Sequence, residues 1–285
     1  MRPTSEGIFD RIIRNTGLIA LVILLFCVVN GCKKNSQIDL KPDLNVATDQ
    51  VLAVRPFTYI VRMVARAAAD STLHAAHQAV IDSAQVTLDA KNQKYTFTFS
   101  DRMCADSVIR SGIFVATVDS GFFHKGTRIL MAFNAYAEDN HRVNGTDSLH
   151  CTGTVNGQYL YDNWISGIVG KDTLRNIAFD AIFHLTVAPG IMVQGVKQTV
   201  IATGGTTHGI SSAGYSYSSS IVNVLTQYER CPWISDGLIY LSIPGVAVPA
   251  GTIEFMGKSV CSDRIQYSFE GNIYPERVRN NFLNF

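Results

Sequence analysis

The feature that most constrains this chain is an apolar–polar alternation with a period of two, repeated in many short segments. In "QKYTFTFS", Tyr95, Phe97 and Phe99 alternate with polar residues. Such alternation is typical of strands that bury one face. Gly and Asn separate most segments, and Asn156-Gly157 is a strong signal of a two-residue hairpin turn. The pattern therefore predicts a mainly β protein, folded as an antiparallel β-sandwich or as one or more curved sheets.

A helical period precedes the strands. In "YIVRMVARAAA" the apolar residues recur at helical spacing, and Asp49 has the side chain of an N-cap. Pro56 lies near the start of this segment, where we expect it to break or kink the helix. Residues 47–78 are therefore expected to form an N-terminal helical segment. Within them "STLHAAH" either extends the helix or begins a second one.

The β-rich region is expected to span residues 79–285. Its length suits one large domain or two β units that divide near residues 165–172. A short echo is compatible with the second reading, because a Cys-x-Asp sequence follows a strand at Cys104 and is found again at Cys261. Chance similarity is the alternative explanation of this echo.

Residues 1–31 have the layout of an export signal. Arg2, Arg11 and Arg14 precede an apolar run at positions 17–29. A helix that spans a bilayer needs about 20 apolar residues. The run is shorter than that, and its length is typical of the apolar core of a secretory signal peptide. An uncleaved anchor is the alternative.

The apolar run ends in Val29-Asn30-Gly31-Cys32, which resembles the lipobox of bacterial lipoproteins. In that family the cysteine thiol receives diacylglycerol, the signal is cut before the cysteine, and the new amine usually takes another acyl chain. The resemblance implies a lipidated Cys32, with residues 32–46 as a polar tether. Two or more acyl chains would hold the protein stably at a membrane. A plain signal peptide with an incidental cysteine is the alternative.

The charge balance bears on partners. The predicted mature chain carries equal numbers of basic and acidic side chains. It lacks the basic excess that is typical of proteins that bind nucleic acids. We therefore expect no nucleic acid as a partner. The expected partners are the membrane, through the lipid anchor, and an envelope protein or a glycan.

Four cysteines remain in the mature chain besides Cys32: Cys104, Cys151, Cys231 and Cys261. An oxidising compartment favours disulfides, and four cysteines allow three connectivities. We expect a Cys231–Cys261 bridge, because each of the two lies near the edge of a neighbouring predicted strand. Four free thiols are the alternative, and the spacing does not match a zinc site.

Longer stretches of the body also carry a resemblance. "FTFSDRMCADSVIRSGIF", "CPWISDGLIYLSI" and "GTIEFMGKSVCSDRIQYSFEG" are similar to stretches of uncharacterised Bacteroidetes-type cell-envelope lipoproteins. The resemblance implies an envelope lipoprotein and no known activity. Lys33 stands where an aspartate would signal retention in the inner membrane, so we expect the outer membrane. An acidic export patch is missing, which favours its periplasmic face over the cell surface.

The sequence indicates no catalytic, metal or cofactor site. His74 and His77 have a spacing at which both side chains could face one metal ion, but no further ligands cluster near them. Gly257-Lys258-Ser259 matches the end of a phosphate-binding loop, yet Thr252 stands where that motif needs its first glycine. We therefore expect a non-enzymatic binding or scaffolding role. The alternatives are a glycan-binding or adhesion module and a hydrolase with a non-contiguous catalytic site.

Besides lipidation of Cys32, a second modification is expected. Asp-Ser or Asp-Thr followed by an apolar residue or threonine recurs along the chain. This pattern resembles the O-glycosylation sequon of exported Bacteroidetes proteins. We expect Ser148, in the predicted loop "RVNGTDS", to carry a glycan. The alternative is that such tripeptides are common in turns and strands.

Overall fold

The computed structural model describes residues 41–170, 175–193, 196–228, 230–247, 249–257 and 260–278. The predicted signal peptide, Cys32 and the first part of the tether lie outside the described residues. Lys258 and Ser259 of the phosphate-loop-like stretch lie outside them as well.

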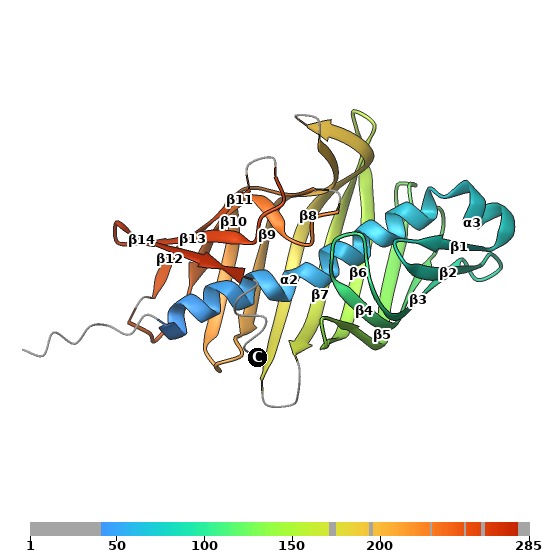
Figure 1. The fold of residues 1–285 in the computed structure, drawn as a ribbon. Helices are drawn as coiled ribbons and strands as arrows, with labels where there is room; N and C mark the ends of the chain where they lie inside the picture. Colours follow the sequence, from blue (N-terminus) through green and yellow to red (C-terminus); the bar gives the residue numbers. More distant parts are fainter. Residues whose placement is uncertain are drawn as a thin grey trace, which may run out of the picture. The chain divides into compact units, whose positions relative to one another are not determined.

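The described chain forms one open antiparallel sheet, in which each strand pairs with the strands next to it in the sequence. This confirms the predicted mainly β class, with a helix ahead of a curved antiparallel sheet. Figure 1 shows the sheet curving around helix α2 (Lys41–Ala68). The strands are β1 (Gln78–Ile81), β2 (Ala84–Asp89), β3 (Lys94–Met103), β4 (Ile109–Val118), β5 (Arg128–Glu138), β6 (His141–Val155), β7 (Gln158–Gly170), β8 (Asn176–Val193), β9 (Val196–Ile210), β10 (Ser216–Tyr228), β11 (Ile234–Ser242), β12 (Ala250–Met256), β13 (Arg264–Phe269) and β14 (Asn272–Arg277).

Helix α2 lies on the concave face of the sheet and contacts both edge strands, β1 and β14, as well as the central strands β7, β8 and β9. Its side chains are buried on every side, with Phe57, Tyr59, Ile60 and Met63 fully inaccessible. A helix that is buried on every side is enclosed by other elements rather than lying on the surface. The hydrophobic core of the protein is therefore the contact between this helix and the concave face.

The helix departs from the expected segment in three ways. It begins at Lys41, inside the predicted tether, and it runs through Pro56 to Ala68, so the expected break is wrong. Pro56 leaves the carbonyl of Leu52 without its usual helical donor, and burial of the helix offsets this cost. Asp49 lies within the helix rather than at its N-cap.

A second helix, α3 (Ser71–Ala76), follows α2. Asp70 caps it by accepting a hydrogen bond from the backbone N–H of Leu73 at 2.9 Å. The turn at Ala69 and Asp70 therefore ends the first helix. The stretch "STLHAAH" begins a second helix, which was one of the two alternatives expected from the sequence.

The sheet continues through the region where a division into two units was considered. Strands β7 and β8 pair without a register shift from Tyr159–Val187 to Gly170–Asn176. The predicted hairpin turn is also present, because Asn156 and Gly157 have φ values of 51° and 75° between β6 and β7.

The structure contains the favoured disulfide. Cys231, just before β11, is bonded to Cys261, after β12, with their Cα atoms 5.3 Å apart. Cys104 and Cys151 are free and buried. The bridge therefore ties together the two ends of the β11–β12 hairpin.

Candidate functional site

Three buried arginines at the contact of α2 with the sheet are paired with carboxylates. Arg110 of β4 donates to Asp106 at 2.7 and 2.8 Å and to Glu138 at 2.8 Å. From α2, Arg55 lies 3.1 Å from Glu138 and Arg62 lies 3.6 Å from Asp106. None of the five is more than 3% exposed. We call these five side chains the arginine network.

Aromatic rings surround the arginine network. The ring of Tyr59 lies 3.3 Å from the guanidinium carbon of Arg110, and Trp233 stacks at 5.0 Å from that of Arg55. The Tyr136 hydroxyl donates to Glu138 at 2.9 Å. Such cation–π contacts are strongest where water is excluded, so the rings and the carboxylates together replace the lost hydration of the arginines.

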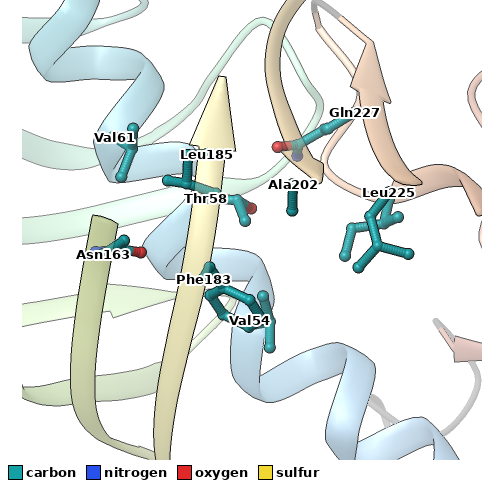
Figure 2. A pocket seen from close by; sticks show the side chains of 10 residues that line it. Val54, Thr58, Val61, Asn163, Phe183, Leu185, Ala202, Leu225 and Gln227 are labelled. Atoms are coloured by element: carbon teal, nitrogen blue, oxygen red, sulfur yellow. The ribbon is translucent and has the colours of Figure 1, made fainter. Parts of the chain in front are cut away.

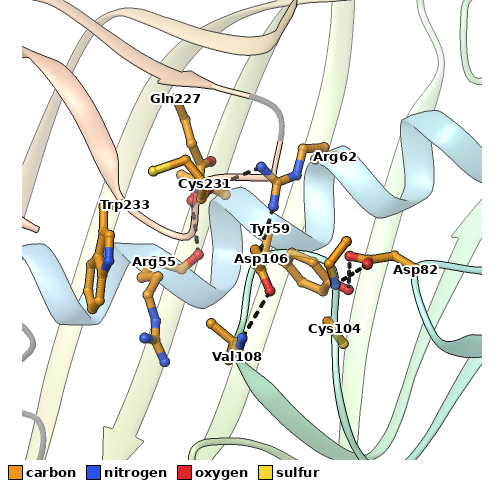
Figure 3. A network of polar contacts seen from close by, with 12 residues as sticks. Arg55, Tyr59, Arg62, Asp82, Cys104, Asp106, Val108, Gln227, Cys231 and Trp233 are labelled. Carbon is orange, nitrogen blue, oxygen red and sulfur yellow. Dashed lines mark hydrogen bonds and ion pairs between the residues drawn. The ribbon is translucent and has the colours of Figure 1, made fainter. Parts of the chain in front are cut away.

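Arg62 extends the network to the disulfide loop. Its Nη1 donates to the carbonyls of Tyr228 and Cys231 at 3.2 and 3.3 Å. Figure 3 shows its guanidinium between Cys231 and Asp106. The helix is thereby fixed both to the turn before β4, which holds Asp106, and to the segment that leads into β11.

The charged groups of this network pair with one another. Burial raises the pKa of Asp106, but Arg110 and Arg62 outweigh that effect and hold its pKa below the ordinary value. Burial lowers the pKa of Arg62. Arg55 also lies 3.3 Å from Asp139, so the three guanidiniums face three carboxylates. The network therefore holds α2 in place with its charges balanced.

Two cavities lie between α2 and the concave face, and Figure 2 shows the first of them. Each has a volume of about 20 Å³, which suits a single water molecule. The first is lined by Val54, Thr58, Val61, Asn163, Phe183, Leu185, Ala202, Leu225, Gln227 and Ile234. The second shares Val54, Phe183, Leu225 and Ile234 with the first and is otherwise lined by Gln50, Val51, Gly205, Thr207, Ser219, Ile221, Ile239 and Phe255.

Three polar side chains that line these cavities have atoms without a hydrogen-bond partner in the protein. They are Gln227 Oε1 in the first cavity and Gln50 Oε1 and Thr207 Oγ1 in the second. Each of the three residues is at most 4% exposed. An unsatisfied buried polar atom costs about 1–3 kcal/mol, so each is a ready partner for a group that enters.

A buried carboxyl group lies next to the first cavity. Asn163, which lines the cavity, donates through its amide to Asp147 Oδ1. Asp147 is 1% exposed, and burial raises its pKa to about 8. At neutral pH this carboxyl therefore holds its proton, and the acid–amide pair carries no charge.

The convex face has a different character. Trp164 of β7 pairs with Ile182 of β8, and the two are 42% and 44% exposed. The strand register extends this pair into one row across the sheet, which we call the convex row. Its exposed apolar members are Leu130, Trp164, Ile182, Tyr240 and Ile273, and the positions between them hold Ser148, Thr206, Ser220, Thr252 and Ser268.

Histidine and aspartate side chains flank Trp164 on both sides. On one side, His184 Nδ1 lies 2.7 Å from Asp162 Oδ1. On the other side, Asp180 is the cross-strand partner of His208, and both are exposed. An exposed indole ring is thus framed by hydrogen-bonding groups on an open surface.

The structure changes the setting of one predicted site residue. Ser148 lies within strand β6 rather than in a loop, half-buried in the convex row, and its hydroxyl donates to the carbonyl of Trp164 at 3.5 Å. Its glycosylation stays a prediction. Of the two histidines considered for a metal, His74 bonds the carbonyl of Ala68 at 3.0 Å. Within the described ranges no three metal-ligating side chains gather.

Sequence reasoning considered Trp164 for a sugar-binding face, but it missed the arginine network and the His and Asp side chains that flank Trp164. The arginine network had a signal in the sequence, because Arg55 and Arg62 are seven residues apart in the predicted helix and therefore share one face. The signal for the flanking side chains was the alternation of Asp162, Trp164 and Ser166 with buried residues along β7. Neither pattern predicts which strands supply the neighbouring residues.

Searches of protein-family models, curated proteins and solved structures found no match to this chain. Neither of the described helices combines the length and the apolar character required to cross a membrane. Function is therefore inferred from the chemistry of the surfaces and cavities described above.

Proposed function

We propose that the chain is a lipid-anchored protein of the cell envelope that binds a glycan on its convex face without catalysing a reaction. The N-terminal pattern that ends in Cys32 supports export and lipidation. Lys33, together with the missing acidic export patch, supports the periplasmic face of the outer membrane. The neutral charge balance of the predicted mature chain agrees with an uncharged ligand.

The exposed Trp164 between its flanking His and Asp side chains carries this proposal. An indole ring offers a flat apolar face, against which the C–H face of a sugar ring packs. Imidazole and carboxylate groups beside the ring can then form hydrogen bonds with the sugar hydroxyls. Adjacent strands lie about 4.8 Å apart, so the Ser and Thr hydroxyls of the convex row are repeated along the path of an extended chain.

Binding is favoured over hydrolysis by the setting of the histidine. A hydrolytic site would bring a nucleophile to a histidine that a carboxylate orients. His184 has its Asp162 partner, but its side chain is 59% exposed on an open face, away from both cavities. The arrangement is thus better suited to contacting an extended ligand than to excluding water from a reaction.

The two tryptophans of the chain allow a direct test of glycan binding. Trp233 is buried, so Trp233→Phe leaves the exposed Trp164 as the sole indole reporter. We expect its emission to shift to the blue and to saturate with at least one of the hexasaccharides of glucose, N-acetylglucosamine, mannose or xylose.

The matched variants are made in the wild-type background and measured by calorimetry. Trp164→Ala should weaken binding at least tenfold, because the stacking face is lost. Val155→Ala, which truncates an exposed apolar side chain outside the convex row, should leave binding unchanged. Unchanged Trp164 emission with all four sugars, or equal affinity of Trp164→Ala and wild type, would contradict the proposal.

The anchor is tested separately in cells. Cys32→Ser removes the thiol that would be acylated, and we expect the protein to move from the membrane pellet to the soluble fraction. Cys27→Ser, a substitution inside the predicted signal peptide, is the matched control and should stay in the pellet. A Cys32→Ser protein that sediments like the wild type would rule out lipidation as the anchor.

A further inference from the structure

We propose that the convex face binds an extended, uncharged chain of β-1,4-linked sugars of the gluco configuration, such as a cello-oligosaccharide. The chain would lie along the convex row and stack on two aromatic rings, Trp164 and Tyr240. This inference rests on the glycan binding proposed above, and it adds the linkage, the configuration and the length of the ligand.

Trp164 and Tyr240 lie in one row although they belong to strands β7 and β11. The cross-strand partners that connect them are Ile182, Thr206 and Ser220. Both rings are accessible, with 42% of Trp164 and 43% of Tyr240 exposed. Four strand spacings therefore separate the two rings, which is a path of about 19 Å across the convex face.

The separation of the two rings fits a straight chain of β-1,4-linked pyranoses. Each sugar ring advances such a chain by about one strand spacing, and successive rings are turned over. Rings that are four positions apart therefore present the same face to the sheet. A chain of at least five rings can stack on both aromatic side chains at once, whereas an α-1,4-linked chain coils away from a straight path.

A row of polar side chains runs beside this path. It lies two residues away on each strand, on the same face of the sheet, and we call it the polar row. Its members are paired across the strands in the order Ser166, Asp180, His208, Ser218 and Ser242, and all are exposed or half-buried. Side chains two residues apart on one strand are separated by about 7 Å, so the polar row lies within reach of the rim of a sugar ring.

The two rows together favour the gluco configuration. In such a sugar every hydroxyl is equatorial, so the faces of the ring carry only C–H groups and the hydroxyls lie at its rim. The faces suit the rings of Trp164 and Tyr240, and the rim suits the hydroxyl, imidazole and carboxylate groups of the polar row. An axial hydroxyl, as in mannose, removes one of the two faces from stacking.

The charges along the path favour a neutral polymer. Ile182, Thr206 and Ser220, which lie between the two aromatic rings, are all uncharged. Beside them the polar row has one carboxylate, Asp180, next to His208. A chain of uronic acids would bring its carboxylates towards Asp180 and find no arginine or lysine in either row, whereas a neutral chain meets no such repulsion.

The test is a length series of cello-oligosaccharides, titrated into the wild-type protein by isothermal titration calorimetry. Cellotetraose is too short to reach both aromatic rings, whereas cellohexaose reaches both. We expect cellohexaose to bind at least tenfold more tightly than cellotetraose. Equal affinity of the two sugars would overturn the arrangement with two stacking rings.

Variants of Tyr240 locate the second stacking ring. Tyr240→Ala should bind cellohexaose at least tenfold more weakly than the wild type, and its retained binding of cellotetraose shows that it is folded. Tyr240→Phe keeps the flat ring and should bind both sugars like the wild type. Met103→Ala, which truncates an exposed side chain on β3, is the matched control and should do the same. Wild-type affinity of Tyr240→Ala for cellohexaose would overturn the role of Tyr240.

Two further sugars test the linkage and the configuration. Maltohexaose has the same sugar in α-1,4 linkage and should bind at least tenfold more weakly than cellohexaose, and β-1,4-linked mannohexaose should bind severalfold more weakly. Equal affinity for cellohexaose and either sugar would overturn that part of the inference while glycan binding itself stands. Absence of binding by all of these sugars would be the failure of the proposed function, and this inference would fall with it.

Discussion

At the scale of single residues, the partners of a buried carboxyl group decide its ionisation. Asp106 and Asp147 are both almost inaccessible. Asp106 faces two guanidiniums, which hold its pKa below the ordinary value, whereas Asp147 has an amide partner and a pKa of about 8. One of these side chains therefore stabilises the fold as an anion, and the other is compatible with the fold as a neutral acid.

The raised pKa of Asp147 predicts a stability that falls as the pH rises. The folded state keeps a proton that the unfolded chain releases near pH 4, so each pH unit from about 4 to 8 costs up to about 1.4 kcal/mol. Asp49, whose pKa burial raises to about 6, adds to this fall below pH 6. Asp147→Asn has no titrating group at this position. The part of the pH dependence of stability that comes from Asp147 should therefore be absent in this variant.

Urea unfolding at pH 5 and pH 8 measures this difference. We expect the wild type to lose about 2 kcal/mol or more relative to Asp147→Asn over this interval. Asp101→Asn, at an exposed carboxyl, should behave like the wild type. If wild type and Asp147→Asn decline in parallel, Asp147 is already ionised in the folded protein.

At the scale of elements, helix α2 is largely buried, and its Arg55 and Arg62 pair with carboxylates outside the helix. Its helical character was predictable from spacing, but its start at Lys41 and its passage through Pro56 were not. A helix that is enclosed on all sides has no polar face to mark its limits. Tertiary packing also overrides the local penalty of a proline, which sequence patterns alone cannot reveal.

The arginine network predicts a large loss of stability when its centre is removed. Arg110→Met keeps much of the side-chain volume but leaves Asp106 and Glu138 buried without their main partner. Removing one member of a buried ion pair costs about 3–5 kcal/mol, and we expect a loss of that size in urea unfolding.

The matched control is an arginine in an exposed pair. Arg277, which is 50% exposed, lies 3.9 Å from Asp263, and Arg277→Met should change the free energy of unfolding by less than about 0.5 kcal/mol. If Arg110→Met and Arg277→Met lower the free energy of unfolding by similar amounts, burial does not make the network more important for stability than an exposed ion pair.

At the scale of the whole molecule, the sheet was largely predictable because its strands pair in sequence order. Local alternation and turn residues such as Asn156-Gly157 are sufficient for such an arrangement. The disulfide partners were predictable for the same reason, since they lie at the two ends of one hairpin. The curvature around α2 and the arginine network depend on contacts between distant residues, for which the local pattern has no signal.

The disulfide predicts a redox-dependent stability of the whole domain. Cys231 and Cys261 are separated by 30 residues, and closing a loop of this length is worth about 3–4 kcal/mol in the chain-entropy account. The double variant Cys231→Ala/Cys261→Ala should therefore unfold at a lower temperature than the oxidised wild type, and added dithiothreitol should not lower it further.

The free cysteines supply the control for this prediction. Cys104→Ala/Cys151→Ala keeps the bridge, so its melting temperature should still fall when dithiothreitol is added. A wild-type melting temperature that is the same with and without reductant would contradict a stabilising bridge.

The position of α2 ahead of the sheet has a consequence for the order of events in synthesis. The helix is made first, yet the carbonyls that Arg62 contacts lie 166 and 169 residues further along the chain. A chain that emerges N-terminus first therefore exposes the apolar residues of this helix until nearly all of the strands have followed. During that interval the nascent protein is prone to self-association.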